Sequence, residues 1–169
     1  VHGVVKPSKE KLSGAIDLAA AENGGIVVTA NDVYFGPKDN LIMPGRAAHM
    51  GEGWETRRKR GPGFDWIIVK LCGAGKISKI EVDTNHYKGN FPDRCSIEAI
   101  TISEPMQACD FRDRKDLKWT EILPQTKLKA NHQHYFEKEL TNVSQTYNYL
   151  RLNIYPDGGI SRLRVTGTL

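Results

Sequence analysis

The 169-residue sequence has little cysteine, no long apolar run and no dense basic stripe. Its cysteines are odd in number and widely spaced, which argues against a disulfide framework and favours a reducing compartment; they are Cys72, Cys95 and Cys109. No segment is apolar for long enough to cross a bilayer, and the printed sequence has no signal-peptide pattern. We therefore expect an intracellular protein, cytoplasmic or peroxisomal, with no membrane partner.

The charge balance excludes a second class of partner. The formal net charge of +4 is a mild excess, and no aromatic residues are interleaved with the basic run at residues 57–60. A nucleic-acid binder would carry a denser basic surface with stacking side chains, so we expect no nucleic-acid partner. The charge does favour a small anionic ligand through long-range attraction.

Long helical patterns are also missing, and short apolar runs between turn residues fill most of the chain. A short helical turn is expected at residues 17–22, and the charged segment 107–118 is expected to be a surface excursion. Strands are predicted at residues 26–30, 66–71, 77–83, 95–102, 119–123, 132–140, 149–155 and 161–165. This pattern is typical of an all-β protein, an antiparallel β-sandwich or barrel. We expect a single domain at residues 15–169, preceded by a linker or N-terminal extension at residues 1–14.

Two strands on either side of Gly73-Ala74-Gly75 are expected to form an antiparallel hairpin. In such a hairpin the first strand, 66–71, begins at the same end of the sheet where the second strand, 77–83, finishes. The loop that ends at Asp65 and the loop that begins at Asp83 should therefore converge.

A second hairpin is expected near the C-terminus, where a Pro-Asp-Gly-Gly turn separates residues 149–155 from residues 161–165. One face of this hairpin would be apolar, and the other would carry Arg151, Arg162 and Arg164. These arginines either bind a ligand or form only the outward face of an edge hairpin.

Four motifs occur in a specific order along the chain. They are Trp54-Glu55-Thr56-Arg57-Arg58, Asp65-Trp66, Asp83-Thr84-x-His86-Tyr87-x-Gly89-Asn90 and Arg151-Leu152-Asn153-x-Tyr155-Pro156-Asp157-Gly158-Gly159. With these four motifs the sequence resembles the allantoicase family. The resemblance extends over the chain from Asp17 onward. The resemblance implies a jelly-roll antiparallel β-sandwich of the galactose-binding-like type, and hydrolysis of allantoate to ureidoglycolate and urea.

The resemblance also has consequences for assembly. Family members that resemble this chain carry two tandem copies of the domain. The segments LIMPGR and NFPDRCS of this chain are most similar to the second copy. We therefore expect pairing with a second allantoicase repeat, or a homo-oligomer.

The convergent loops supply the residue types that this chemistry needs. Allantoate carries a carboxylate and two ureido groups. Its binding requires a planar cation such as arginine for the carboxylate and hydrogen-bond acceptors for the ureido N–H groups, and its hydrolysis requires a proton donor for the leaving group. We hypothesise that Glu55 or Asp83 is the general base and that His86 is the acid. Arg57 and Arg60 would hold the substrate carboxylate, and Asn90 a ureido group. The full set of candidate substrate-binding residues is Arg57, Arg60, Asp65, Lys88, Asn90, Arg151 and Arg162.

Non-catalytic alternatives fit several of the same residues. Asp83 and Thr84 could simply cap a strand end and organise a turn. Phe64 stands where the family often has histidine, which leaves open an inactive allantoicase-like domain. A ligand-binding domain without chemistry is a further alternative, because fold does not fix function. Only Tyr87 and Phe91 would then serve as exposed aromatic residues at loop tips.

The sequence requires no cofactor. His132 and His134 have period-two spacing, so on a strand they would share a face and could supply half of a metal site. The alternative is a polar strand face. No metal ligand is therefore assigned, and a divalent metal stays an open alternative.

Overall fold

The computed structural model describes residues 14–169, so the predicted N-terminal linker lies outside the described residues except for its last position. Its regular structure is mainly antiparallel β-sheet. Its strands are β1 (Ile16–Asp17), β2 (Ile26–Ala30), β3 (Trp54–Glu55), β4 (Asp65–Asp83), β5 (Arg94–Ile100), β6 (Thr120–Lys127), β7 (Gln133–Phe136), β8 (Tyr147–Tyr155), β9 (Gly159–Ile160) and β10 (Arg162–Thr168).

The helices of the described chain are short. They are η2 (Ala21–Asn23), η3 (Lys38–Ile42), η4 (Met50–Glu52) and α1 (Ala108–Asp113). None of the helices within residues 14–169 is long and apolar enough to span a membrane. The helical turn predicted at residues 17–22 overlaps η2 only in part, because Asp17 belongs to β1 and η2 begins at Ala21. Gly24 adopts the left-handed conformation that ends η2.

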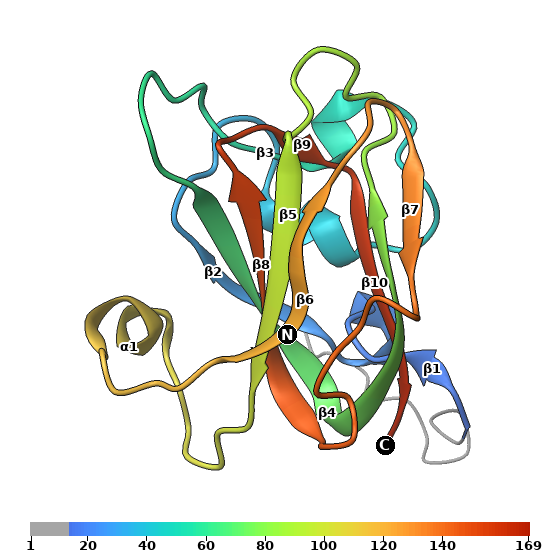
Figure 1. The fold of residues 1–169 in the computed structure, drawn as a ribbon, viewed down its shortest axis with the longest axis vertical. Helices are drawn as coiled ribbons and strands as arrows, with labels where there is room; N and C mark the ends of the chain where they lie inside the picture. The colour runs from blue at the N-terminus through green and yellow to red at the C-terminus, as the bar shows by residue number, and fades with distance from the viewer. Residues whose placement is uncertain (1–13) are drawn as a thin grey trace, which may run out of the picture.

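The strands form two antiparallel layers that share β4 (Figure 1). One layer has the order β2-β4-β8-β5-β6 and uses residues 65–70 of β4. The other has the order β1-β10-β4-β7 and uses residues 76–83. Apolar side chains from both layers, such as Leu152 and Val165, are fully buried in one core cluster. The prediction of an all-β antiparallel sandwich is thereby confirmed.

The first predicted hairpin is wrong, because β4 is a single strand of 19 residues. It bends near Gly73 and Gly75 and passes from one layer to the other, so its two halves pair with β8 and β10 rather than with each other. Both ends of β4 nevertheless rise to the same end of the molecule (Figure 1). Asp65 and Asp83 thus reach one end of the sandwich, as expected, although by a different path.

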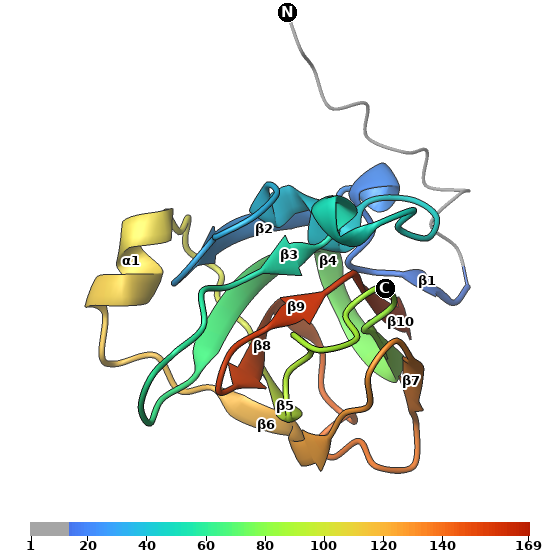
Figure 2. The same cartoon turned by 90° about the horizontal axis from the view of Figure 1, so that it is seen from above.

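The second predicted hairpin is also wrong. β8 pairs with the first half of β4 and with β5, whereas β10 pairs with the second half of β4 and with β1. The link between them contains β9, which pairs with β3 in a short ribbon across the end of the sandwich (Figure 2). Arg151 and Arg162 therefore lie in different layers and not on one face.

The charged segment predicted as a surface excursion contains α1. Phe111 of this helix is buried against the outer surface of the β2-to-β6 layer, where it contacts the rings of Tyr149 and Trp119 at centroid distances of 5.1 Å and 6.2 Å. A small second apolar cluster forms there. No helical periodicity predicts this helix, because Phe111 stands almost alone in a run of charged residues.

The bend in β4 leaves no room for a side chain at Gly75. A Cβ atom there would lie 2.9 Å from both the carbonyl oxygen of Thr168 and the Cδ1 atom of Leu18. We expect Gly75→Ala to lower the free energy of unfolding by about 2 kcal/mol, because the added methyl group would overpack this part of the core. Gly89→Ala is the control, since a Cβ at Gly89 meets no heavy atom within 4 Å. Denaturant titrations that give equal stability for the two variants would contradict this account.

Candidate functional site

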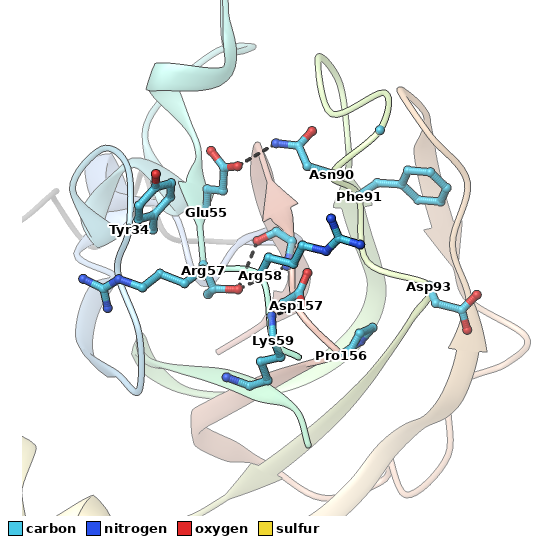
Figure 3. A pocket seen from close by; sticks show the side chains of 13 residues that line it. Tyr34, Glu55, Arg57, Arg58, Lys59, Asn90, Phe91, Asp93, Pro156 and Asp157 are labelled. Atoms are coloured by element: carbon cyan, nitrogen blue, oxygen red, sulfur yellow. Dashed lines mark hydrogen bonds between the residues drawn. The ribbon is translucent and has the colours of Figure 1, made fainter. Parts of the chain in front are cut away.

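A pocket of about 900 Å³ opens at the end of the sandwich that carries β3 and β9. Four segments contribute to it: the loop after β2, β3 with the residues that follow it, the loop after β4, and the turn between β8 and β9. The lining residues are Tyr34, Glu55, Thr56, Arg57, Arg58, Lys59, Gly89, Asn90, Phe91, Asp93, Pro156, Asp157 and Gly158 (Figure 3).

Hydrogen bonds hold three of these segments together. The Thr56 N–H donates to the carbonyl oxygen of Gly158 at 2.9 Å, and the Gly158 N–H donates to Thr56 Oγ1 at 3.1 Å. The Gly159 N–H donates to the carbonyl oxygen of Asn90 at 2.9 Å. A Cβ at Gly158 would lie 2.7 Å from that same oxygen, and a Cβ at Gly159 would overlap the Tyr87 ring. The two glycines therefore permit the close approach of the motifs.

Glu55 and Asn90 form a hydrogen-bonded pair on the wall of the pocket. Trp54 of the short strand β3 is fully buried, so its neighbour Glu55 points to the other side, into the pocket. Asn90 Nδ2 donates to Glu55 Oε1 at 2.6 Å (Figure 3). Within residues 14–169, Glu55 Oε2 and Asn90 Oδ1 accept no hydrogen bond, so each can receive one from a ligand.

Three consecutive cations border the pocket and differ in their partners. The Arg57 guanidinium pairs with Asp32 at 2.6 Å, and the Lys59 ammonium pairs with the fully buried Asp65 at 2.5 Å. Arg58 extends across the pocket in Figure 3, and it forms no ion pair with the described part of the chain. Arg58 is therefore the cation that remains free to bind an anion.

The pocket brings together only part of the predicted site. Glu55, Arg57 and Asn90 line it. The predicted residues that do not line it are Arg60, Asp65, Asp83, His86, Lys88, Arg151 and Arg162. Asp65 contacts the pocket indirectly, through its ion pair with Lys59.

Asp83 and His86 are engaged elsewhere. Asp83 is fully buried, and its two oxygens accept hydrogen bonds from the Arg46 guanidinium and the Asn85 N–H, each at 2.8 Å. This is the turn-organising geometry of the alternative interpretation. His86 Nε2 lies 2.7 Å from the carbonyl oxygen of Ala47, to which it donates. Both side chains thus stabilise loops around the pocket without reaching into it.

Arg151 and Arg162 also have intramolecular partners. Arg151 pairs with Glu98 at 2.9 Å, and its guanidinium lies 4.5 Å from the centre of the Trp119 ring. Arg162 is only 3% exposed and donates to backbone carbonyl oxygens along the loop that follows β2. Those oxygens belong to Asn40, Gly45 and Glu52, and a further one to Ser161.

The sequence prediction missed Arg58 as a pocket residue and was wrong about one of two aromatic residues. Alternation from Glu55 would place Arg57, not Arg58, on the same side, but β3 ends at Glu55 and the alternation ends with it. Tyr87, predicted to be exposed, is fully buried, whereas Phe91 does line the pocket.

Phe64 lies outside the pocket and packs on Tyr155, with ring centroids 5.4 Å apart. The substitution that raised doubt about activity therefore leaves the pocket lining unchanged.

His134 uses both ring nitrogens within the fold. Nδ1 donates to the carbonyl oxygen of Val82 at 2.9 Å, and Nε2 accepts the Lys129 N–H at 2.8 Å. Such bonding requires a neutral imidazole. Within residues 14–169, no three His, Cys, Asp or Glu side chains are grouped in a way that could hold a metal ion.

A pH-dependent contribution to stability follows from His134. Burial lowers the pKa of this imidazole below its ordinary value of 6.5, so the unfolded state binds a proton more readily than the folded state. The stabilisation is therefore present above pH 6.5 and is lost as the pH falls below it. We expect His134→Gln to destabilise the protein by about 1 kcal/mol at pH 8, and by progressively less at lower pH. His132→Gln is the control, and a pH-independent loss for His134→Gln would refute the assignment.

The buried Arg162 is expected to act on stability. Arg162→Lys keeps the charge but cannot reproduce the planar fork that bonds several carbonyl oxygens at once. We expect the free energy of unfolding to fall by about 3 kcal/mol, because carbonyl groups are left unsatisfied. Arg60→Lys, at an exposed position, should change it little. Equal stabilities in a denaturant titration would instead favour a ligand-binding role for Arg162.

Comparisons with known proteins address the family. A family model described as "Allantoicase repeat" matches residues 16–169. The allantoicase of Dictyostelium discoideum is 51% identical over 154 residues, which cover 91% of this chain and 41% of that protein. "Probable allantoicase 1" of Burkholderia mallei is 50% identical over 157 residues, which cover 93% of this chain and 46% of that protein.

Solved structures agree with the sequence comparison. The crystal structure of allantoicase from Saccharomyces cerevisiae matches with a TM-score of 0.77 and 35% identity, over 90% of this chain and 43% of that one. A family 32 carbohydrate-binding module from C. perfringens NanJ, solved with galactose, has a TM-score of 0.60 and 14% identity over 90% of this chain and 98% of its own. It shares the fold alone. The chain spans less than half the length of these allantoicases. It belongs to the allantoicase family.

Proposed function

We propose that the pocket binds allantoate and that this domain takes part in its hydrolysis to ureidoglycolate and urea. The observation that carries the proposal is the arrangement of Glu55, Asn90 and Arg58 around one pocket in a member of the allantoicase family. A free guanidinium, a carboxylate and an amide oxygen are the groups that an anion with two ureido substituents requires.

Arg58 would bind the substrate carboxylate through two parallel hydrogen bonds. Its guanidinium is not neutralised within the described chain, whereas Arg57 is paired with Asp32 and Arg60 does not line the pocket. Arg58 therefore replaces Arg57 and Arg60 in this role. Asn90 donates to Glu55, so its Oδ1 atom is free to accept a ureido N–H.

Glu55 is the proposed general base. Of the other carboxylates on the pocket wall, Asp157 accepts the Lys59 N–H at 2.6 Å and Asp93 pairs with Arg94 at 2.9 Å. Asp83, the alternative base, is buried behind Arg46. Glu55 thus combines access to the pocket with an unengaged oxygen.

A stepwise route needs only this carboxylate as proton carrier. Glu55 removes the N–H proton of the ureido group that stays, the bond between the central carbon and the other ureido nitrogen breaks, and Glu55 returns the proton to the departing urea. Water then adds to the central carbon of the resulting acylimine. Glu55 accepts the proton of this water and delivers it to the imine nitrogen, which yields ureidoglycolate.

Several finer statements stay predictions. They are the domain boundary at residue 15, assignment to the second repeat, pairing with another allantoicase repeat or a homo-oligomer, and a cytoplasmic or peroxisomal location. The alternative of a carbohydrate-binding module loses one of its two supporting residues, because Tyr87 is buried.

Replacement of Glu55 tests the proposed chemistry. We expect Glu55→Gln to lower kcat for urea release from allantoate by at least about 100-fold, since Gln cannot carry the proton but can still accept from Asn90. Arg58→Lys should instead raise KM about tenfold, because an ammonium cannot form the bidentate contact. Arg60→Lys is the matched control. A Glu55→Gln variant with wild-type turnover would rule out Glu55 as the base.

The same assay decides two further questions. Repeating it with chelator and with added divalent cations tests a metal requirement. A folded wild-type chain that releases no urea would contradict the activity of this domain on its own, and allantoate binding measured by calorimetry would then decide whether the pocket recognises the substrate.

A further inference from the structure

We propose that Asp32 and Asp157 are positioning residues that present Arg58 to the pocket. The inference rests on the proposed role of Arg58 in binding an anionic substrate. Neither carboxylate has to touch the substrate. Each holds the backbone of a residue next to Arg58, so that the arginine between them is fixed from both sides.

Asp32 holds the preceding residue with both of its oxygens. Its Oδ2 atom accepts the Arg57 backbone N–H at 2.7 Å, and its Oδ1 atom accepts the Arg57 guanidinium at 2.6 Å. The Asp32 backbone is itself anchored, because its carbonyl oxygen accepts the indole N–H of the fully buried Trp54 at 2.9 Å. Arg57 is thereby tied to the core of the sandwich.

Asp157 holds the following residue. Its Oδ2 atom accepts the Lys59 backbone N–H at 2.6 Å, and the Lys59 ammonium is bound at 2.5 Å by Asp65, which is fully buried. The neighbouring Gly158 bonds Thr56 through backbone and side chain. Lys59 is therefore fixed at its backbone and at the end of its side chain.

The carboxylates of Asp32 and Asp65 also set the charge distribution of the pocket. Asp32 neutralises Arg57 and Asp65 neutralises Lys59, so the free positive charge is concentrated on Arg58. In Figure 3 the Arg57 and Lys59 side chains point away from the centre of the pocket, whereas Arg58 crosses it. A substrate carboxylate would thus meet one defined cation rather than a run of three.

Fixing the backbone on both sides of Arg58 has an energetic consequence. An arginine on an irregular segment would lose backbone freedom when it binds a ligand, and this loss would weaken binding. Asp32 and Asp157, the two clamps of this segment, remove that freedom when the protein folds. They therefore favour anion binding without adding a contact to the ligand.

The test combines a measurement on the free protein with steady-state kinetics on the same full chain. We expect Asp32→Ala and Asp157→Ala to lower the amide order parameter of Arg58 from about 0.85, typical of rigid backbone, toward about 0.6 in ¹⁵N relaxation experiments. KM for allantoate should rise about tenfold, and kcat should change by less than about twofold. Asp157→Asn should keep the order parameter and KM close to their wild-type values, because the Oδ1 atom of asparagine can still accept the Lys59 N–H.

Asp39→Asn is the matched control, since within residues 14–169 this half-exposed carboxylate pairs only with its neighbour Lys38, and it lies outside the pocket lining. Clamps that only stabilise the fold would lower the melting temperature and leave KM unchanged. That result, or an unaltered order parameter at Arg58 in both alanine variants, overturns the proposal. If the wild-type chain neither binds nor hydrolyses allantoate, the proposed function fails, whereas the order parameter still decides whether the clamps position Arg58.

Discussion

The passage of β4 from one layer of the sandwich to the other is the constraint on which the site depends. Its first half is hydrogen-bonded to β8 and its second half to β10, so the chain that links β8 to β10 must cross the end of the sandwich where β4 begins and finishes. That link contains Asp157, Gly158 and β9. The loops on either side of β4 arrive at the same end, and the pocket forms among these three segments.

The long segment between β2 and β4 meets this end with little regular structure, so its backbone groups need other partners. Arg162 supplies several of them, because its guanidinium bonds carbonyl oxygens of Asn40, Gly45 and Glu52. Trp54 contributes an indole N–H. An arginine predicted to bind the substrate thus serves the architecture of the pocket, because its Nε and Nη1 groups already donate to carbonyl oxygens.

Charge in the pocket is controlled by pairing. Glu55 is bonded to a neutral amide, and its second oxygen accepts no hydrogen bond from the part of the chain that the structure describes. Asp32 and Asp65 are instead bonded to the cations on either side of Arg58. A free carboxylate and a free guanidinium therefore face the same space. This separation of roles is what a reaction on a small anion needs, since the anion must be held by one group while another carries the proton.

The sequence by itself determined the sandwich, the family and the convergence of the loops before and after β4, and it predicted that Glu55 and Asn90 lie among these loops. It did so because short β-branched runs, turn residues and ordered motifs are local signals. Tertiary structure alone decided that β4 crosses between layers, because the sequence Gly73-Ala74-Gly75 is as typical of a hairpin turn as of a bend within one strand. It also decided that Arg58 has no ion-pair partner within residues 14–169, whereas Arg162 is buried. The partners of an arginine are carboxylates and carbonyl oxygens far away in the chain, and no local pattern records them.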